Sequence, residues 1–159
     1  LKTGKMDDRS IFIKDLLAKT PDTKFDIYGL DKVQPIWADH YFKTISNAKM
    51  GLNLSRGETI KYYSSDRITQ IVGNGLVCLI DEKTQYRDFF NDNEMVFYKN
   101  TSDLSEKILK ISRDDKRRKE IAKKGKKKYM KYFNSELVAE YIVNRTLGIS
   151  NKKNLIWQK

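Results

Sequence analysis

The stretch between residues 64 and 81 most constrains the fold, because it joins a short amphipathic helix directly to an unbroken apolar run. The run Leu76–Ile80 contains no polar alternation, which is typical of a strand covered on both faces in the middle of a parallel sheet. Before it, Ser65–Val72 places apolar residues at helical spacing. The sequence Gly73–Gly75 then predicts that this helix ends in a left-handed C-cap.

Apolar runs and helical stretches alternate along the rest of the chain, with connections long enough for right-handed crossovers. Predicted strands lie at Phe25–Gly29, Met50–Leu54, Leu76–Ile80 and Met95–Tyr98. Predicted helices lie at Arg9–Lys19, His40–Asn47, Ser65–Val72, Tyr86–Phe90 and Asp103–Ile111, followed by a basic helix after Asp114 and a last helix after Asn134. The expected fold is α/β: one Rossmann-like domain with a doubly wound parallel sheet over residues 1–150, and a polar tail at 151–159.

Length and residue usage narrow the class of protein further. The 159 residues are enough for one domain, and no apolar run approaches the ~20 residues that span a bilayer. The first residue is not Met, so we expect a fragment whose first strand has been cut off before Leu1. The single cysteine, Cys78, lies inside an apolar run and is interpreted as a small buried hydrophobic residue. With one His and one Cys, metal-ligand spacing is missing from the sequence, and a reducing compartment, the bacterial-type cytoplasm, is predicted.

The net charge of +11 favours partners that carry phosphate. Ten of the 32 basic residues fall between Lys116 and Lys131. In a helix, Ile121, Gly125 and Tyr129 would face inward and the lysines outward, so the favoured interpretation is a solvated face. A membrane-surface patch and a nucleic-acid contact are sharper alternatives. The sequence contains no RNA-stacking motif with interleaved aromatic residues, which makes nucleic acid the less favoured partner.

Ligands of open parallel sheets bind outside the carboxyl ends of the strands. Loops there carry Arg56, and the following helix begins at Ser64 or Ser65, with Arg67 in its first turn. Backbone N–H groups at a helix start and two arginines together predict an anion site. The alternative is that Ser64 only caps the helix and that Arg67 is solvated or ion-paired.

The segment from Gly51 to about Tyr132 resembles the C-terminal domain of GT-B glycosyltransferases, in particular the group-1 and spore-maturation-like branches. The strand reads MGLNLS, and the stretch from Gln70 to Val77 is similar to the family's helix and small-residue turn, E-A-x-A-x-G-x-P-V. Arg67 matches the arginine of an R-x-x-E arrangement. The family's closing helix, with arginine, alanine and glycine, is similar to the basic helix here; its matching residues are Arg118, Ala122 and Gly125.

The resemblance implies a donor-binding half that takes a nucleotide-diphospho-sugar, works without a metal or other cofactor, and faces an N-terminal acceptor-binding domain that this chain lacks. The acceptor domain usually supplies any general base, so we name no catalytic residue and expect the fragment alone to be inactive. Arg9, after the Gly4 turn, resembles a glycine-then-arginine opening near the diphosphate. Gln70 stands where the family has a glutamate on the ribose; an amide has one acceptor oxygen where a carboxylate has two.

The expected location is therefore cytoplasmic and peripheral to the membrane, with a lipid-linked acceptor compatible with the lysine-rich helix. The alternative function is a non-enzymatic basic α/β module that binds nucleic acid or an anionic surface.

Overall fold

The computed structural model describes residues 8–55, 57–63, 65–150 and 155–158. Its sheet has three parallel strands in the order β1 (Met50–Asn53), β2 (Val77–Asp81) and β3 (Val96–Tyr98). The central strand is the one that the sequence marks as buried on both faces. Residues 77–80 are each at most 4% exposed, which confirms that prediction.

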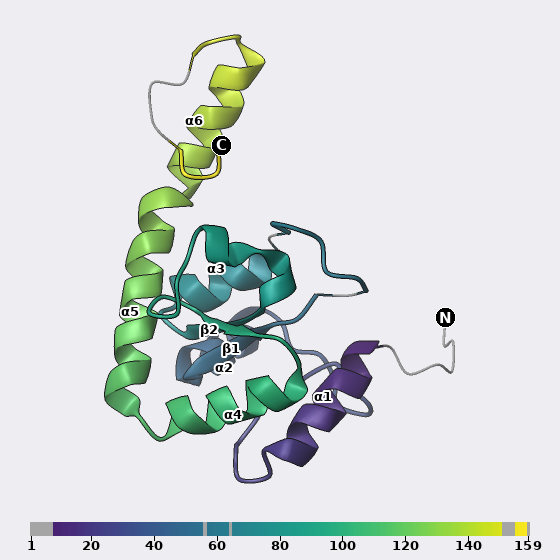
Figure 1. The fold of residues 1–159 in the computed structure, drawn as a ribbon. Helices are drawn as coiled ribbons and strands as arrows, with labels where there is room; N and C mark the ends of the chain where they lie inside the picture. Colours follow the sequence, from purple (N-terminus) through teal and green to yellow (C-terminus); the bar gives the residue numbers. More distant parts are fainter. Residues whose placement is uncertain (1–7, 56, 64, 151–154, 159) are drawn as a thin grey trace.

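Helices cover both faces of the sheet (Figure 1), as a doubly wound domain requires. The helices α1 (Asp8–Lys19) and α4 (Thr101–Ser112) pack on the face that holds Val77 and Leu79. On the other face, α3 (Asp66–Gly73) and the segment between β2 and β3 pack over Cys78 and Ile80. That segment contains two 3-10 turns, η1 (Glu82–Thr84) and η2 (Tyr86–Asp88).

The turn from α3 into β2 forms as its glycines predict. Gly75 has a positive φ of 76°. Its N–H bonds to the carbonyl of Val72 at 3.0 Å, and the next N–H, of Leu76, bonds to that of Ile71 at 3.1 Å. These two bonds make a Schellman motif, which satisfies the last carbonyls of the helix and turns the chain directly into the central strand.

The basic helix α5 (Asp115–Tyr132) runs past the amino ends of the strands. Its buried side carries the expected Ile121, Ala122, Gly125 and Tyr129, together with Arg118, whose guanidinium pairs with Asp115. A Cβ on Gly125 would lie 2.2 Å from the carbonyl oxygen of Glu94, just before β3. Only glycine permits this approach of helix backbone to loop backbone. Most of the lysines of α5 are exposed, as a solvated face requires.

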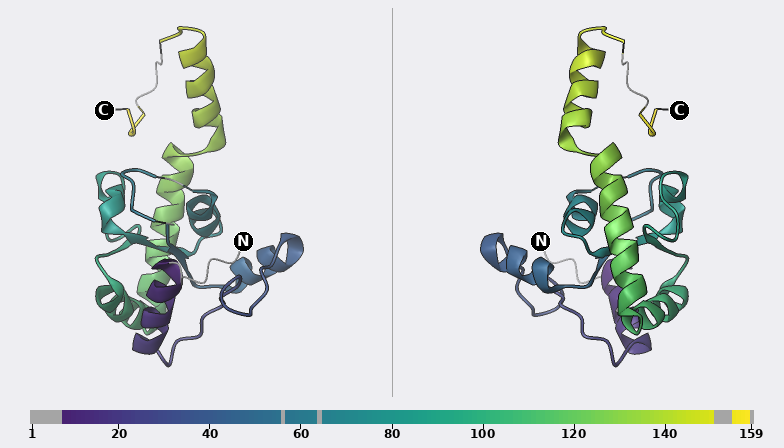
Figure 2. Two further views of the ribbon diagram at one scale, coloured as in Figure 1. Left: turned by 90° about the vertical axis from the view of Figure 1, so that its right-hand side faces the viewer. Right: turned by 90° about the vertical axis from the view of Figure 1, so that its left-hand side faces the viewer.

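The last helix, α6 (Ser135–Thr146), extends away from the domain (Figures 1 and 2), and in the part of the chain described here none of its residues is buried. The end of the chain returns toward the core: Leu155 is buried, and the ring of Trp157 lies 5.4 Å from that of Phe133. Of the helices that the structure describes, none combines the length and apolar character that crossing a bilayer requires.

The strand predicted at Phe25–Gly29 does not form. Residues 25–28 are without regular structure, although alternate side chains are partly buried as in a strand. Phe25 contacts the core, but no described neighbour offers this segment a ladder of backbone hydrogen bonds. A strand needs that partner as well as the pattern. The next helix, α2 (Ala38–Asn47), matches its prediction apart from two residues at its start.

Candidate functional site

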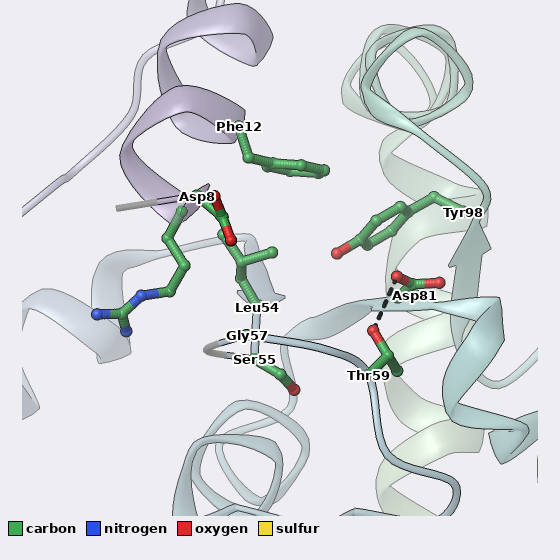
Figure 3. A pocket seen from close by; sticks show the side chains of 9 residues that line it. Asp8, Phe12, Leu54, Ser55, Gly57, Thr59, Asp81 and Tyr98 are labelled. Carbon is green, nitrogen blue, oxygen red and sulfur yellow. Dashed lines mark hydrogen bonds between the residues drawn. The ribbon is translucent and has the colours of Figure 1, made fainter. Parts of the chain in front are cut away.

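A cavity of about 160 Å³ opens where the three strands end. Leu54 follows β1, while Asp81 and Tyr98 are the last residues of β2 and β3. The first turns of α1 form one wall and the loop after β1 the other (Figure 3). The lining residues are Asp8, Arg9, Phe12, Leu54, Ser55, Gly57, Thr59, Asp81 and Tyr98. The cavity therefore occupies the edge where open parallel sheets bind ligands.

A second cavity, of about 230 Å³, lies near the opposite edge, between α4, α5 and the start of β3. Its walls include Met95, Phe97, Ile111 and Ile121. Its lining side chains come mainly from helices and from the amino end of β3, and it lacks converging loops. The first cavity is the better candidate, because loops after several strands meet only there.

Tyr98 contributes a buried hydroxyl to the first cavity. The residue is 1% exposed, and its ring lies 5.8 Å from that of Phe12. Among the described residues, its hydroxyl is the buried side-chain group without a hydrogen-bond partner. Burial raises the pKa of Tyr98 well above its usual range, and the negative charge of Asp81 adds to the rise. The phenol is therefore a neutral donor at every ordinary pH.

Asp81 anchors the loops around the end of β2. One of its carboxylate oxygens accepts the backbone N–H of Lys83 at 2.8 Å, and the other accepts the hydroxyl of Thr59 at 3.3 Å. The backbone carbonyl of Asp81 accepts the hydroxyl of Thr84 at 2.6 Å. These bonds hold the carboxylate at the floor of the cavity with acceptor positions still unused.

The structure places Arg9 in the cavity wall, on the first turn of α1, beside Asp8. Phe12, one turn further on, faces Tyr98 from the same helix. Spacing of three to four residues puts such side chains on one face of a helix. Within the described ranges, no three His, Cys, Asp or Glu side chains gather into a group that could hold a metal ion.

The start of α3 lies beside the cavity, but its side chains bind the protein itself. Ser65 occupies the N-cap position without a side-chain capping bond, and its hydroxyl lies 3.4 Å from the amide oxygen of Asn53. Arg67 donates to the carbonyl of Leu54 at 2.7 Å. Arg67 therefore supports the end of β1, and neither Ser65 nor Arg67 lines the cavity.

The remaining predicted site residues are Gln70, Arg56 and Ser64, and Gln70 is not among the residues that line the cavity. Gln70 lies on the next turn of α3, partly exposed, and its backbone carbonyl accepts from Asn74. Arg56 and Ser64 lie outside the described residues. The structure thus brings Arg9 into the cavity, sets Ser65 and Arg67 next to it, and leaves Gln70 a turn further along the helix.

The sequence does not single out Phe12, Thr59, Asp81 or Tyr98 as site residues. For two of them a signal exists: each is the last residue of a parallel strand, where side chains face the ligand edge. Thr59 lies in the loop that follows the predicted strand Met50–Leu54, so its place at the ligand edge could be expected from the sequence. For Phe12 the sequence holds no comparable signal, because a helix brings it to the cavity only in the folded chain.

Comparison with known proteins agrees with this geometry. The family described as glycosyl transferase-like matches residues 9–144, most of the chain. No curated protein and no solved structure resembles the chain closely enough to count as a match. The matched range begins at Arg9 in the cavity wall and includes all three strands and α5. The chain belongs to the glycosyl transferase-like family.

Proposed function

We propose that the chain is the donor-binding half of a GT-B glycosyltransferase, which transfers a sugar from a nucleotide-diphospho-sugar to an acceptor held by a separate N-terminal domain. The observation that carries the proposal is the cavity at the carboxyl ends of β1, β2 and β3, with Arg9 in its wall. Family membership supports glycosyl transfer as the reaction class.

In this proposal the diphosphate of the donor lies between Arg9 and the start of α3. Negative charge grows on the diphosphate as the bond to the sugar breaks, and a fixed guanidinium and the N–H groups of a helix start stabilise it. In this proposal these groups neutralise the diphosphate, so no metal ion is required for this task. The acceptor domain supplies any base that removes the acceptor proton.

Gln70 takes the ribose of the donor in the same proposal. It lies one turn beyond Arg67 on α3 and is partly exposed. An amide side chain accepts through one oxygen and donates through its nitrogen. Gln70 therefore holds the ribose hydroxyls less firmly than the glutamate that the similar GT-B glycosyltransferases have at this position.

The test is a calorimetric titration of the chain with UDP, GDP, ADP and CDP. Arg9→Ala removes a charged hydrogen bond to phosphate, which typically contributes about 1.5–3 kcal/mol, so affinity should fall roughly ten- to a hundredfold. Lys14→Ala is the matched control. It removes a cation from the same helix, but this lysine pairs with Asp31 at 3.1 Å and does not line the cavity.

Equal loss of affinity in the two variants would point to general electrostatic attraction by a basic protein and against a defined diphosphate site. Binding of no nucleoside diphosphate would refute the proposal. Strong, salt-sensitive binding of random DNA or RNA in its place would favour the alternative function, a basic module for nucleic acid.

A further inference from the structure

We propose that Tyr98, Asp81 and Thr59, here called the Tyr98 corner, recognise the hydroxyl groups of an uncharged sugar ring of the donor. The inference rests on the proposed function and goes beyond it, because it assigns ligand-binding roles to residues outside the diphosphate site. The ring that fits this chemistry is the sugar that is transferred, or else the ribose, which would then bind at the corner and not at Gln70.

The first argument is the hydroxyl of Tyr98. It exposes less than 1 Å² to solvent and bonds to no described residue. Buried polar groups nearly always have a partner, so such a group requires an explanation. The comparison within the chain is Tyr129, also buried, whose hydroxyl lies 2.8 Å from that of Thr69. A bound ligand gives Tyr98 the partner that the protein does not.

The second argument is direction. Figure 3 shows the Tyr98 hydroxyl pointing into the space between Leu54 and Asp81. The ring itself is fixed on the last residue of β3, with Phe12 on its other side. A donor held so firmly costs little further ordering when a ligand binds to it.

The third argument is the charge in the corner. Asp81 is a carboxylate with about four acceptor positions, two of which already accept from Lys83 and Thr59. The free positions accept hydroxyl protons, but the same negative charge repels phosphate oxygens. The corner therefore takes a polyol and excludes the diphosphate.

The shape of the cavity completes the assignment. Phe12, Leu54 and the ring of Tyr98 form an apolar wall suited to the C–H face of a sugar ring. A volume of about 160 Å³ is below the roughly 300–1,000 Å³ of sites that enclose a whole drug-sized ligand. One ring occupies the cavity, and the charged remainder of the donor lies outside it.

The experiment compares the wild-type chain with Tyr98→Phe and Asp81→Asn, and uses Tyr129→Phe as the matched control. Calorimetry measures binding of UDP, GDP, ADP and CDP, and of UDP-glucose, UDP-N-acetylglucosamine, GDP-mannose and ADP-glucose. Loss of one neutral hydrogen bond lowers affinity about two- to tenfold, and loss of a charged one about ten- to a hundredfold. We expect these losses in Tyr98→Phe and Asp81→Asn respectively, and none in Tyr129→Phe.

The two sets of ligands distinguish whether the corner binds the ribose or the transferred sugar. Weaker binding of nucleotide-sugars alone assigns the corner to the transferred sugar. If the corner variants bind both the nucleoside diphosphates and the nucleotide-sugars more weakly than the wild type, the corner binds the ribose. In that case the variants and the wild type should bind 2′,3′-dideoxynucleoside diphosphates with equal affinity.

Unchanged affinity in both corner variants, with wild-type binding intact, overturns the inference and leaves the proposed function standing. If the wild type binds no nucleotide at all, the proposed function fails and the inference fails with it. Circular dichroism confirms that each variant is folded, and because Tyr98→Phe keeps the ring, it preserves the packing against Phe12.

Discussion

Replacing Tyr98 by Phe should make the ligand-free protein more stable, which is unusual for a change in a buried side chain. The variant keeps the ring that packs against Phe12 and removes only the hydroxyl that has no partner among the described residues. In the native state this group has lost its hydrogen bonds to water without replacing them. In the unfolded chain the hydroxyl is hydrated, so its burial opposes folding.

The size of the effect follows from that desolvation. A buried polar group left unsatisfied costs about 1–3 kcal/mol, so the free energy of unfolding should rise by about this amount. For a chain of this length, 1 kcal/mol shifts the melting temperature by roughly 2–4 °C. We therefore expect the melting temperature of Tyr98→Phe, measured without nucleotide, to rise by about 2–12 °C.

Tyr129→Phe provides the opposite case in the same fold. Its hydroxyl is paired with that of Thr69 at 2.8 Å, so its removal should lower the free energy of unfolding by about 0.5–1.5 kcal/mol. Equilibrium urea unfolding followed by circular dichroism measures both variants, with the midpoint and slope fitted separately. A Tyr98→Phe variant that is destabilised as much as Tyr129→Phe would refute the reasoning, because it would show that the Tyr98 hydroxyl has a partner in the free protein.

Further predictions concern the packing, the thiol, the lysine face and the helix α3. Gly125→Ala should destabilise the chain by about 1–3 kcal/mol or more, because its Cβ would lie 2.2 Å from the carbonyl oxygen of Glu94. Gly73→Ala is the matched control: its Cβ would lie 3.8 Å from the methyl of Met130, an ordinary contact, so it should be neutral or stabilising by up to about 1 kcal/mol in the same urea assay. Burial raises the pKa of Cys78 to about 12, so iodoacetamide should not alkylate the native protein at pH 8.5 but should do so in urea; fast native alkylation would contradict the buried position. Reversing the charges of Lys123, Lys127 and Lys131 to Glu should change the free energy of unfolding by less than about 1 kcal/mol and leave nucleotide affinity unchanged, since all three are exposed. Gln70→Glu supplies a second acceptor oxygen, so it should raise the affinity for nucleoside diphosphates but not for their 2′,3′-dideoxy analogues. If the variant and the wild type bind nucleoside diphosphates with equal affinity, Gln70 does not contact the ribose.

The elements that the sequence predicts well are those whose determinants are local. The central strand needs only its apolar run, and the turn before it needs only Gly75 at a left-handed position. The inward side of α5 follows from the spacing of Ile121, Gly125 and Tyr129. Phe25–Gly29 shows the limit of this reasoning, because its pattern is local but a strand also requires a neighbour at hydrogen-bonding distance.

The sequence predicts where the candidate site lies but not which residues line it. The carboxyl-end rule identifies the edge at which the cavity opens, and Arg9 lies in the wall of that cavity. Arg67 has the residue type of a phosphate ligand, yet it donates to the carbonyl of Leu54. Tyr98 has the pattern of a core residue, and only the folded chain shows that its hydroxyl lacks a partner. Whether a buried hydroxyl has a hydrogen-bond partner depends on all the elements that surround it, so no local sequence pattern can predict it.

The position of α5 has a consequence for engineering the protein. The helix packs near the amino ends of the strands, with Gly125 against the backbone before β3, whereas the loops that line the cavity leave the carboxyl ends. Residues 54–63 and 82–85 can then be exchanged as a set of loops without touching the contacts that hold α5 in place. A library confined to these loops should yield altered ligand preference in folded proteins, whereas the same number of substitutions around Glu94 should yield mainly unfolded ones.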